Sequence, residues 1–263
     1  MNTEEIIVLL VPVAFIVMLA IERIWPARQF PRVSHWHWIG IGLFIYAMVM
    51  NSVLPMLVPE DWLRDRRLFN LSALGLLPSV VIGHMIITFG TYAWHRASHE
   101  FTPLWRGFHQ LHHSPRHLNI YAANCSHPTD LTVYIVLPVL IALFVLGVDP
   151  LAAAILGNLG AFNAFFQHWN VRTPQWIGYL FQRPESHCIH HQRGLHRYNY
   201  SDFPLWDIVF GTFRNPRTWE GQTGFDEPAD GRYGAMLAFV DVNAPVIGAN
   251  SFGQAPARAP SEP

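Results

Sequence analysis

Four long stretches of this sequence carry almost no charged residues, and they limit what the chain can fold into. The four stretches are residues 6–21, 38–59, 68–94 and 131–166. An apolar run of about 20 residues is long enough to cross a bilayer as a helix. The last stretch is interrupted by Asp149 and Pro150, so we expect a hairpin of two helical arms there. The sequence therefore predicts an all-α fold, a polytopic membrane helical bundle with four or five membrane helices.

The composition agrees with a membrane protein and argues against other classes. Hydrophobic residues make up 51% of the chain and charged residues 13%, against about 25% charged residues in soluble domains. The net charge of -1 provides no basic surface, so we expect no nucleic-acid partner. Cys125 and Cys188 form neither a disulfide framework nor a Cys-x-x-Cys site, so metal ligands must be mostly histidines.

Histidines are concentrated in three clusters beside the apolar stretches. The clusters read His95-x-x-x-His99, His109-x-x-His112-His113 and His187-x-x-His190-His191. Residues at i, i+3 and i+4 of a helix share a face, so we expect each cluster to aim its imidazoles at a common point. Neutral imidazole is a ligand for iron, zinc and copper. An isolated pair would be read as surface or core histidines, but the repeated pattern predicts a site for more than one ion.

His168 directly follows the predicted hairpin, and we expect it to be a ninth ligand. The alternative is an interfacial histidine among aromatic residues, which are common at that depth. His117, His127 and His196 fit no cluster, so we expect them at the surface or in contact with the ligating rings. Acidic residues that could orient imidazoles are Glu100, Asp130, Glu185, Asp202 and Asp207. Asp207 stands alone in an apolar stretch, and we expect it to dock the C-terminal segment onto the core.

A polar stripe follows one face of the third apolar stretch. The stripe consists of His84, Thr88, Thr91, His95 and His99, at steps of four or three residues. Polar groups at membrane depth are costly and normally face the interior of a bundle or a cavity. We therefore expect the stripe to point inward and to lead from membrane depth to the histidine clusters.

Charges in the polar segments indicate the topology. Arginines concentrate in the histidine-rich segments, at positions 96, 106, 116, 172, 183, 193 and 197. By the positive-inside rule the histidine site is cytoplasmic, and an even number of crossings separates it from residues 22–37. The first apolar run lacks a basic n-region and a cleavage site, so we expect a retained anchor. We expect an integral protein of a bacterial inner membrane.

Several longer motifs resemble those of the fatty acid hydroxylase and sterol desaturase superfamily of membrane oxygenases. They are Trp94-His95-Arg96-x-x-His99-Glu100, Leu104-Trp105-x-x-Phe108-His109-x-x-His112-His113-Ser114, His187-x-x-His190-His191, Asn199-Tyr200-Ser201 and Trp206-Asp207-x-x-Phe210-Gly211-Thr212-Phe213. The resemblance covers about residues 80–215 and is closest to the sterol-desaturase-like and alkylglycerol-monooxygenase-like branches. We therefore divide the chain into N-terminal membrane helices (1–70), a catalytic domain (71–220) and a partly disordered C-terminal extension (221–263).

The resemblance implies a helical membrane fold with a histidine-rich cytosolic cap over two iron ions, a di-iron centre. It also implies activation of O2 and hydroxylation or desaturation of a lipid or sterol. The implied metal ligands are His95, His99, His109, His112, His113, His168, His187, His190 and His191, with no separate catalytic residue. Members often carry an arginine shortly before a His-Pro pair, whereas Asn124-Cys125-Ser126 precede His127-Pro128 here. How the substrate or the cap is held therefore stays open.

Iron agrees with this chemistry, because an unactivated C–H bond requires a redox metal and zinc has no redox chemistry. The chain carries no Gly-x-Gly-x-x-Gly motif, iron–sulfur cysteines or haem domain, so we expect no other bound cofactor and a separate electron-donor protein. The main alternative is a histidine-rich membrane metal transporter or metal-binding protein, with ligands spread through several membrane segments. A zinc hydrolase would need only three ligands and a carboxylate. The substrate, the carbon attacked and the choice between hydroxylation and desaturation stay open.

Overall fold

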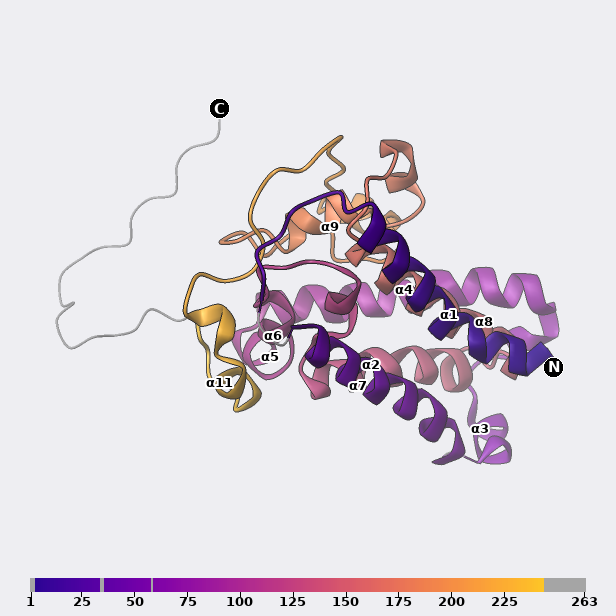
Figure 1. The fold of residues 1–263 in the computed structure, drawn as a ribbon. Helices are drawn as coiled ribbons and strands as arrows, with labels where there is room; N and C mark the ends of the chain where they lie inside the picture. The colour runs from indigo at the N-terminus through magenta and orange to yellow at the C-terminus, as the bar shows by residue number, and fades with distance from the viewer. Residues whose placement is uncertain (1–2, 34–35, 58, 244–263) are drawn as a thin grey trace.

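The long helices of the molecule lie side by side and carry the histidine-rich segments at one end (Figure 1). The computed structural model describes residues 3–33, 36–57 and 59–243. The long helices are α1 (Thr3–Ile24), α2 (Trp36–Val53), α4 (Leu76–Glu100), α7 (Pro128–Val139), which a π-helical segment η5 (Leu140–Val145) extends, and α8 (Pro150–His168). Within the described residues only one isolated bridge, Gln192 to Thr223, interrupts the all-helical architecture. The predicted all-α class is confirmed.

Three helical segments in the described part of the chain are long and apolar enough to cross a membrane. They are Trp36–Val53, Leu76–Glu100 and Pro128–Val145. Two further long helices, α1 and α8, accompany them, and α1 exposes apolar side chains such as Leu10, Val13 and Ile16. Exposed aliphatic side chains along a whole helix are typical of contact with lipid. The polytopic membrane bundle is confirmed, and the number of four or five crossings stays a prediction.

The predicted helical hairpin is confirmed, with its turn at Asp149 and Pro150. The carboxylate of Asp149 accepts a hydrogen bond from the backbone N–H of Ala152 at 2.9 Å and so caps α8. Pro150 occupies the first helical turn, where its missing N–H is not needed. The turn packs against the segment that precedes α4, where the N–H of Leu68 donates to the carbonyl of Phe144 at 2.9 Å. These contacts close the bundle at the end opposite the histidines.

Residues 25–33, between α1 and α2, lie at the histidine-rich end of the bundle. The N–H of Ala27 donates to the carbonyl of Asn170 at 2.9 Å. The indole N–H of Trp36 donates to Asn119 Oδ1 at 3.1 Å. These contacts place the loop at the same end of the bundle as the histidines. Along the chain, α2 and α4 lie between the loop and the first histidine cluster, which agrees with the predicted even number of crossings.

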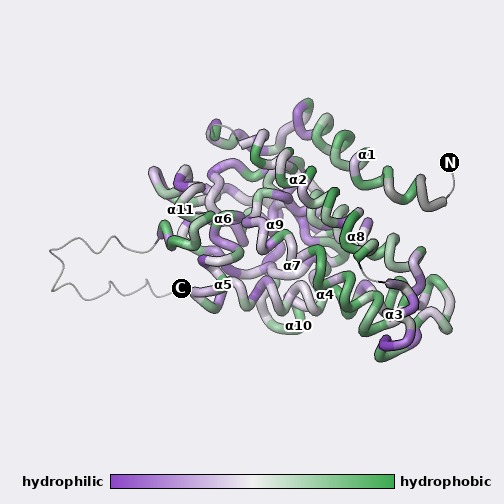
Figure 2. Tube along the Cα trace, turned by 90° about the horizontal axis from the view of Figure 1, so that it is seen from below, coloured by the Kyte–Doolittle hydropathy of each residue, from purple (hydrophilic) through white to green (hydrophobic). Residues whose placement is uncertain are grey.

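Short helices build a cap over the histidine-rich end. They are α5 (Thr102–Leu104), η3 (Trp105–His109), α6 (Gln110–His113), η4 (Ile120–Asn124), η6 (Gln175–Tyr179), α9 (Pro184–His190), α10 (Leu205–Val209), η7 (Ala229–Gly231) and α11 (Tyr233–Leu237). Figure 2 shows hydrophilic residues gathered around α6 and α9, and hydrophobic residues along α1, α4 and α8. The opposite end carries η1 (Leu54–Leu57), α3 (Glu60–Arg66) and η2 (Leu71–Leu74). The hydropathy of the chain thus separates cap from bundle.

The first part of the predicted C-terminal extension packs into the cap. Phe225 and Met236 are buried in its main apolar cluster. The side-chain amide of Gln110 donates to the carbonyl of Val240 at 2.8 Å. The rest of the predicted extension, residues 244–263, lies outside the described residues.

Candidate metal centre

All nine predicted site histidines lie at the ends of helices that converge under the cap. His95 and His99 occupy the last two turns of α4, and His168 is the last residue of α8. The others are His109 at the end of η3, His112 and His113 on α6, His187 and His190 on α9, and His191 directly after it. Most of these side chains are fully buried, and the structure brings together the set that the sequence predicts.

The nine imidazoles form two groups, each with one ring nitrogen per residue within 4.8 Å of the others. The five-histidine group consists of His95, His99, His109, His113 and His190. The four-histidine group consists of His112, His168, His187 and His191. Such a pair of compact nitrogen clusters has the form of two adjacent metal sites.

Each His-x-x-His-His cluster divides between the two groups, which corrects the expectation that a cluster converges on one point. In the second cluster, the outer pair His109 and His113 enters the five-histidine group, while His112 enters the other. In the third cluster His187 and His191 join the four-histidine group, while His190 crosses over. Adjacent residues of a helix differ in direction by about 100°, so the middle histidine diverges from its neighbour. The two clusters therefore interlock.

The four-histidine group is a chain of facing Nε2 atoms. The Nε2 atom of His168 lies 3.2 Å from that of His112 and 3.0 Å from that of His187. The Nε2 atoms of His187 and His191 are 3.1 Å apart. A separation of about 3 Å is expected between neighbouring nitrogens that share one ion about 2.1 Å away. The spacing of these rings fits a shared metal ion.

Two rings of this group have their outer nitrogens fixed by backbone carbonyls. Nδ1 of His168 donates to the carbonyl of Ala164 at 2.7 Å, and Nδ1 of His112 donates to that of Cys125 at 3.2 Å. A proton on Nδ1 leaves the lone pair on Nε2, which is the atom that faces the group. The tautomer of both rings is therefore set for ligation.

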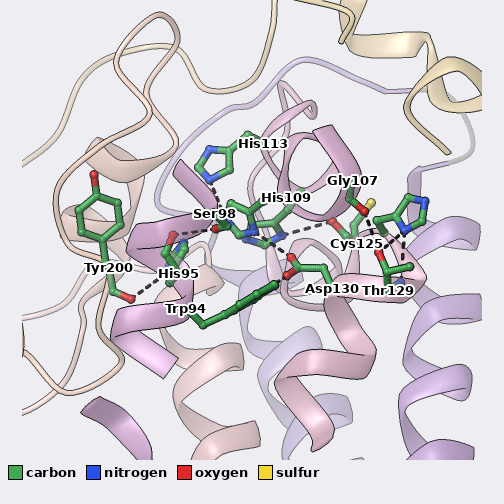
Figure 3. A network of polar contacts seen from close by, with 12 residues as sticks. Trp94, His95, Ser98, Gly107, His109, His113, Cys125, Thr129, Asp130 and Tyr200 are labelled. Atoms are coloured by element: carbon green, nitrogen blue, oxygen red, sulfur yellow. Dashed lines mark hydrogen bonds and ion pairs between the residues drawn. The ribbon is translucent and has the colours of Figure 1, made fainter. Parts of the chain in front are cut away.

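The five-histidine group is held by a carboxylate and by two carbonyls of one loop. Figure 3 shows the contacts of His109 with Asp130 and of His95 with Tyr200. Nδ1 of His109 lies 2.8 Å from Asp130 Oδ2, and the indole N–H of Trp94 donates to Asp130 Oδ1 at 3.1 Å. Nδ1 of His95 donates to the carbonyl of Tyr200 at 2.6 Å. In the same way, Nδ1 of His190 donates to the carbonyl of Tyr198 at 2.7 Å. A carboxylate behind an imidazole orients the ring and raises its basicity.

Unpartnered nitrogens indicate that this group fits a metal ion. Nε2 of His95, His99 and His190 is buried, with no hydrogen-bond partner among the described residues. A buried polar atom without a partner costs about 1–3 kcal/mol. A metal ion would supply the missing partner for each of these lone pairs, so the donor set of the chain fits the implied iron.

Burial keeps the rings of the cap in the form that binds metal. Desolvation lowers the pKa of His109 and that of His112 to about 3. It also lowers the pKa of His113, His187 and His190 well below the ordinary value of 6.5. These imidazoles are neutral at pH 7 and keep a free lone pair, as metal ligation requires.

Of the five predicted carboxylates, only Asp130 contacts a site imidazole in the described structure. Glu185 accepts from Thr173 and pairs with arginines, and Asp202 accepts from Gln167 at 2.9 Å. Glu100 pairs with Arg96 on the outside of α4. Asp207 accepts from backbone N–H groups, as expected for a structural residue. The expectation of an imidazole partner is wrong for Glu185, Asp202 and Glu100, because other side chains and backbone groups engage their carboxylates.

Three further histidines lie outside the two groups. Nδ1 of His196 lies 3.1 Å from Nδ1 of His113, so this ring supports the five-histidine group from outside. His127 caps α7 through the N–H of Thr129 at 3.2 Å. His117 is on the outside of the cap and contacts the carbonyl of Pro31 at 3.0 Å. The positions of His196 and His117 agree with the predicted supporting and surface roles. His127 differs from the prediction, because it is buried and its described contacts are with Thr129, Leu237 and Phe239 and not with a site imidazole.

The loop 196–200 is a part of the site that the sequence did not predict from its residue types. Tyr198 and Asn199 adopt left-handed backbone conformations, with φ of 71° and 50°. Asn199 is held there by its own side chain, whose amide donates to the carbonyl of Ser186 at 2.8 Å and whose Oδ1 accepts from the N–H of Arg214. This turn directs the carbonyls of Tyr198 and Tyr200 toward two histidines. The Asn199-Tyr200 motif was its only signal.

The polar stripe on α4 faces the interior, as predicted. Thr88, Thr91 and His95 are buried, and His84 is half-buried. The indole N–H of Trp206 donates to Thr88 Oγ1 at 3.1 Å. The C-terminal segment around α10 thus docks onto the core, as predicted, and it covers part of the stripe, a position that the sequence did not predict.

An all-helical membrane bundle with nine histidines gathered at one end defines a class of histidine-rich membrane proteins. Within that class, the family model for fatty acid hydroxylases matches residues 80–212, which is half of the chain. The matched region contains every histidine of both groups. The chain belongs to the fatty acid hydroxylase family, and the predicted superfamily is confirmed.

Curated relatives include three lipid- or sterol-directed proteins. The ornithine lipid hydroxylase OlsE of Rhizobium tropici is 35% identical over 52% of this chain and 42% of its own length. A Delta(7)-sterol-C5(6)-desaturase of Nicotiana tabacum is 28% identical over 68% of this chain and 67% of its own. The alkylglycerol monooxygenase of Homo sapiens is 31% identical over 48% of this chain and 28% of its own. The chain thus covers less than half the length of the first and third, and no solved structure matches it significantly.

Proposed function

We propose that this protein is a membrane-bound di-iron oxygenase that hydroxylates or desaturates a lipid or sterol, using O2 and electrons from a separate donor protein. The observation that carries the proposal is the pair of imidazole groups at the end of the membrane bundle. The names of the relatives, a lipid hydroxylase, a sterol desaturase and a monooxygenase, support this reaction class. We assign the catalysis to residues 71–220 and an anchoring role to residues 1–70.

The five-histidine group would hold one iron ion and the four-histidine group the other. Bound iron would supply the redox chemistry for O2 activation that zinc lacks. The chain's own part is to keep the rings neutral, fix their tautomers and exclude water. Asp130 performs the second task for His109, because the carboxylate accepts the Nδ1 proton and leaves the lone pair on Nε2. Burial performs the first task, since desolvation lowers the pKa of His109.

The position of the site suits a substrate that stays in the membrane. His95 lies where the uncharged part of α4 ends. An acyl chain or a sterol ring system can therefore reach the histidines while it stays in the hydrocarbon of the bilayer. On the other side, the rings of Trp105 and Tyr200 pack against His99, with ring centres 5.3 Å away in both contacts. Aromatic packing there shields the reacting carbon from water.

We place the cap on the cytoplasmic side of a bacterial inner membrane. The cap carries most of the arginines, and this asymmetry supports a cytoplasmic location under the positive-inside rule. A reductant protein would then meet the site from the cytoplasm. The transporter alternative has less support, because both groups are enclosed at one end of the bundle and are not spread along the spans.

Isotope labelling of cellular lipids tests the proposed reaction. Cells that express the protein under ¹⁸O2 should accumulate a lipid with a labelled hydroxyl group, or a lipid that has lost two hydrogens. Cells with the His113→Ala variant should not, because one imidazole of the five-histidine group is missing. Lipid profiles that do not differ between the two strains, together with metal-dependent ion flux in vesicles, would overturn the proposal in favour of transport.

A further inference from the structure

We propose that residues 200–213, which include α10, insert into the bilayer beside α4 and meet the lipid acyl chains. The segment follows all three histidine clusters and is too short to span a membrane. Four observations carry the proposal: the depth that the segment reaches, the apolar surface that it shares with α4, the internal use of its polar groups and the aromatic residues where it ends. This inference is independent of the reaction that the site performs.

The segment descends along α4 well below the histidines. The ring of Phe203 lies 5.6 Å from that of His84, and the indole N–H of Trp206 donates to Thr88 Oγ1. His84 precedes His95 by eleven residues, which is about 16 Å along a helix. The hydrocarbon core of a bilayer is about 30 Å thick, so Phe203 reaches roughly its middle.

The outer face of α10 continues the outer face of α4. Ile208, Val209 and Phe210 are exposed by 48%, 60% and 45%. On α4, the exposed Phe89 connects the two surfaces, because its ring centre lies 4.9 Å from that of Trp206 and 6.2 Å from that of Phe210. Figure 2 shows α10 beside the hydrophobic helix α4. Since α4 is a candidate span, the solvent of its outer face is lipid, and the face of α10 shares it.

Residues 200–213 contain two charged residues, and both have partners within the protein. Asp202 accepts a hydrogen bond from Gln167 at 2.9 Å, and Asp207 is fully buried and faces inward. Its carboxylate accepts from the N–H of Tyr200 at 2.9 Å, the N–H of Ser201 at 2.8 Å and the hydroxyl of Thr212 at 2.6 Å. Its carbonyl accepts from the N–H of Thr212 at 2.8 Å. Irregular backbone is tolerated at membrane depth only where its polar groups are satisfied within the protein. Asp207 accepts hydrogen bonds from the backbone N–H groups of the turn before α10 and of the turn after it, so these turns meet the condition.

Aromatic residues mark the level at which the segment leaves the membrane. The ring of Phe213 lies 5.7 Å from that of Tyr179, and the neighbouring Trp176 is 64% exposed. The first charged residue after the segment is Arg214. Tyrosine, tryptophan and arginine are the residues that favour the headgroup region. From Phe203 to Arg214 the segment thus passes from the hydrocarbon core to the headgroup region, and its apolar side chains lie deepest.

The inserted segment connects the lipid to the histidines. Its first residue, Tyr200, holds His95 through its carbonyl, and its Trp206 covers Thr88 of the polar stripe. The segment therefore separates the bilayer from the face of the polar stripe that Trp206 covers. A lipid that approaches the histidines from the α10 side must pass it.

Fluorescence quenching in vesicles tests the insertion. Val209→Cys and the control Glu220→Cys, an exposed position on the cap, would each be labelled with an environment-sensitive fluorophore. The native Cys125 and Cys188 are buried and should not react. In phosphatidylcholine vesicles, acyl-brominated lipid should quench the label at position 209 at least about threefold more than the label at 220. Aqueous iodide should show the opposite order. The circular dichroism spectrum and the monodispersity of each labelled protein, compared with the unlabelled protein, confirm that it is folded.

Two results would overturn the proposal. Iodide quenching at position 209 that equals quenching at 220, without an effect of brominated lipid, would place α10 in water. Insensitivity to both quenchers, with disulfide formation between copies of Val209→Cys, would show that a second copy of the chain covers this face. Neither result depends on turnover, so failure of the insertion and failure of the proposed oxygenase activity are separately visible.

Discussion

The two histidine groups use the same donor atoms but are supported differently from outside. In the five-histidine group, the rings of His95, His109 and His190 have an Nδ1 partner, and one partner is the carboxylate of Asp130. In the four-histidine group, Nδ1 of His187 and of His191 is buried without a partner among the described residues. The two sites therefore have similar inner faces and unequal surroundings.

This difference has a consequence for metal affinity. Hydrogen-bond partners behind ligating imidazoles fix the rings and make them better donors, and their loss costs about 10–100-fold in affinity or activity. The five-histidine group should then hold its ion more tightly than the four-histidine group. The two sites also share their supporting helices, because α6 and α9 each carry one histidine of each group. A shift of either helix would therefore move ligands of both sites.

The largest effect is expected from the middle histidines of the two interlocked clusters. His112→Ala and His190→Ala remove one ligand each, from the four- and the five-histidine group respectively. Activity should fall to background in both, since the two ions would act together. Metal analysis should show that each variant retains about one of the two iron ions. His117→Ala, on the outside of the cap, is the control; activity in either ligand variant equal to that control would break the assignment.

Stepwise chelation compares the two sites in the unaltered protein. A chelator should first remove the ion of the four-histidine group, because Nδ1 of His187 and of His191 has no hydrogen-bond partner among the described residues. The ion of the five-histidine group should leave in a later phase. The metal remaining after the first phase should be sensitive to His190→Ala and insensitive to His112→Ala. Simultaneous loss of both ions in a single phase would show that the outer partners do not make the sites unequal.

Replacement of the one carboxylate sharpens the comparison. Asp130→Asn keeps the size of the side chain but removes the charge behind His109, so metal affinity of the five-histidine group should fall about 10–100-fold. The matched control is Asp202→Asn, because Asp202 contacts Gln167 and no site imidazole. Metal titration of both variants measures the effect. Equal affinities in the two variants would contradict the role given to Asp130.

The smallest effect is expected at His196, which touches His113 from outside. His196→Gln retains a hydrogen-bonding side chain there, and activity should change less than about tenfold, the lower limit for outer partners of metal ligands. Lipid turnover relative to the unaltered protein is the readout, and complete inactivation would place His196 among the ligands.

The sequence was sufficient to predict the bundle and the histidine set, for reasons that are local. Uncharged runs of membrane length mark α1, α2, α4 and the hairpin of α7 and α8, because burial in lipid requires continuous apolar residues. Eight of the nine site histidines stand close together in the chain, and His168 was placed by its position at the end of the hairpin. None of these inferences needed knowledge of how distant segments pack.

The parts that escaped prediction depend on contacts between distant segments. The division of the histidines between two groups depends on how the ends of α4, α6, α8 and α9 meet in space, which the spacing within one cluster does not encode. Asp130 was one of five equivalent candidates until α7 was placed beside η3. The carbonyls of Tyr198 and Tyr200 are backbone atoms without a residue-type signal. The depth of α10 was hidden because its apolar stretch is too short to qualify as a span.

The iron content of the purified protein tests the central claim most directly. The protein would be isolated in mild detergent from cells grown with sufficient iron, and iron, zinc and copper would be measured per chain in the unaltered protein. We expect two iron ions per chain, one for each histidine group. A single ion per chain, or full occupancy by zinc in protein that oxidises its lipid, would contradict a di-iron centre built from these nine histidines.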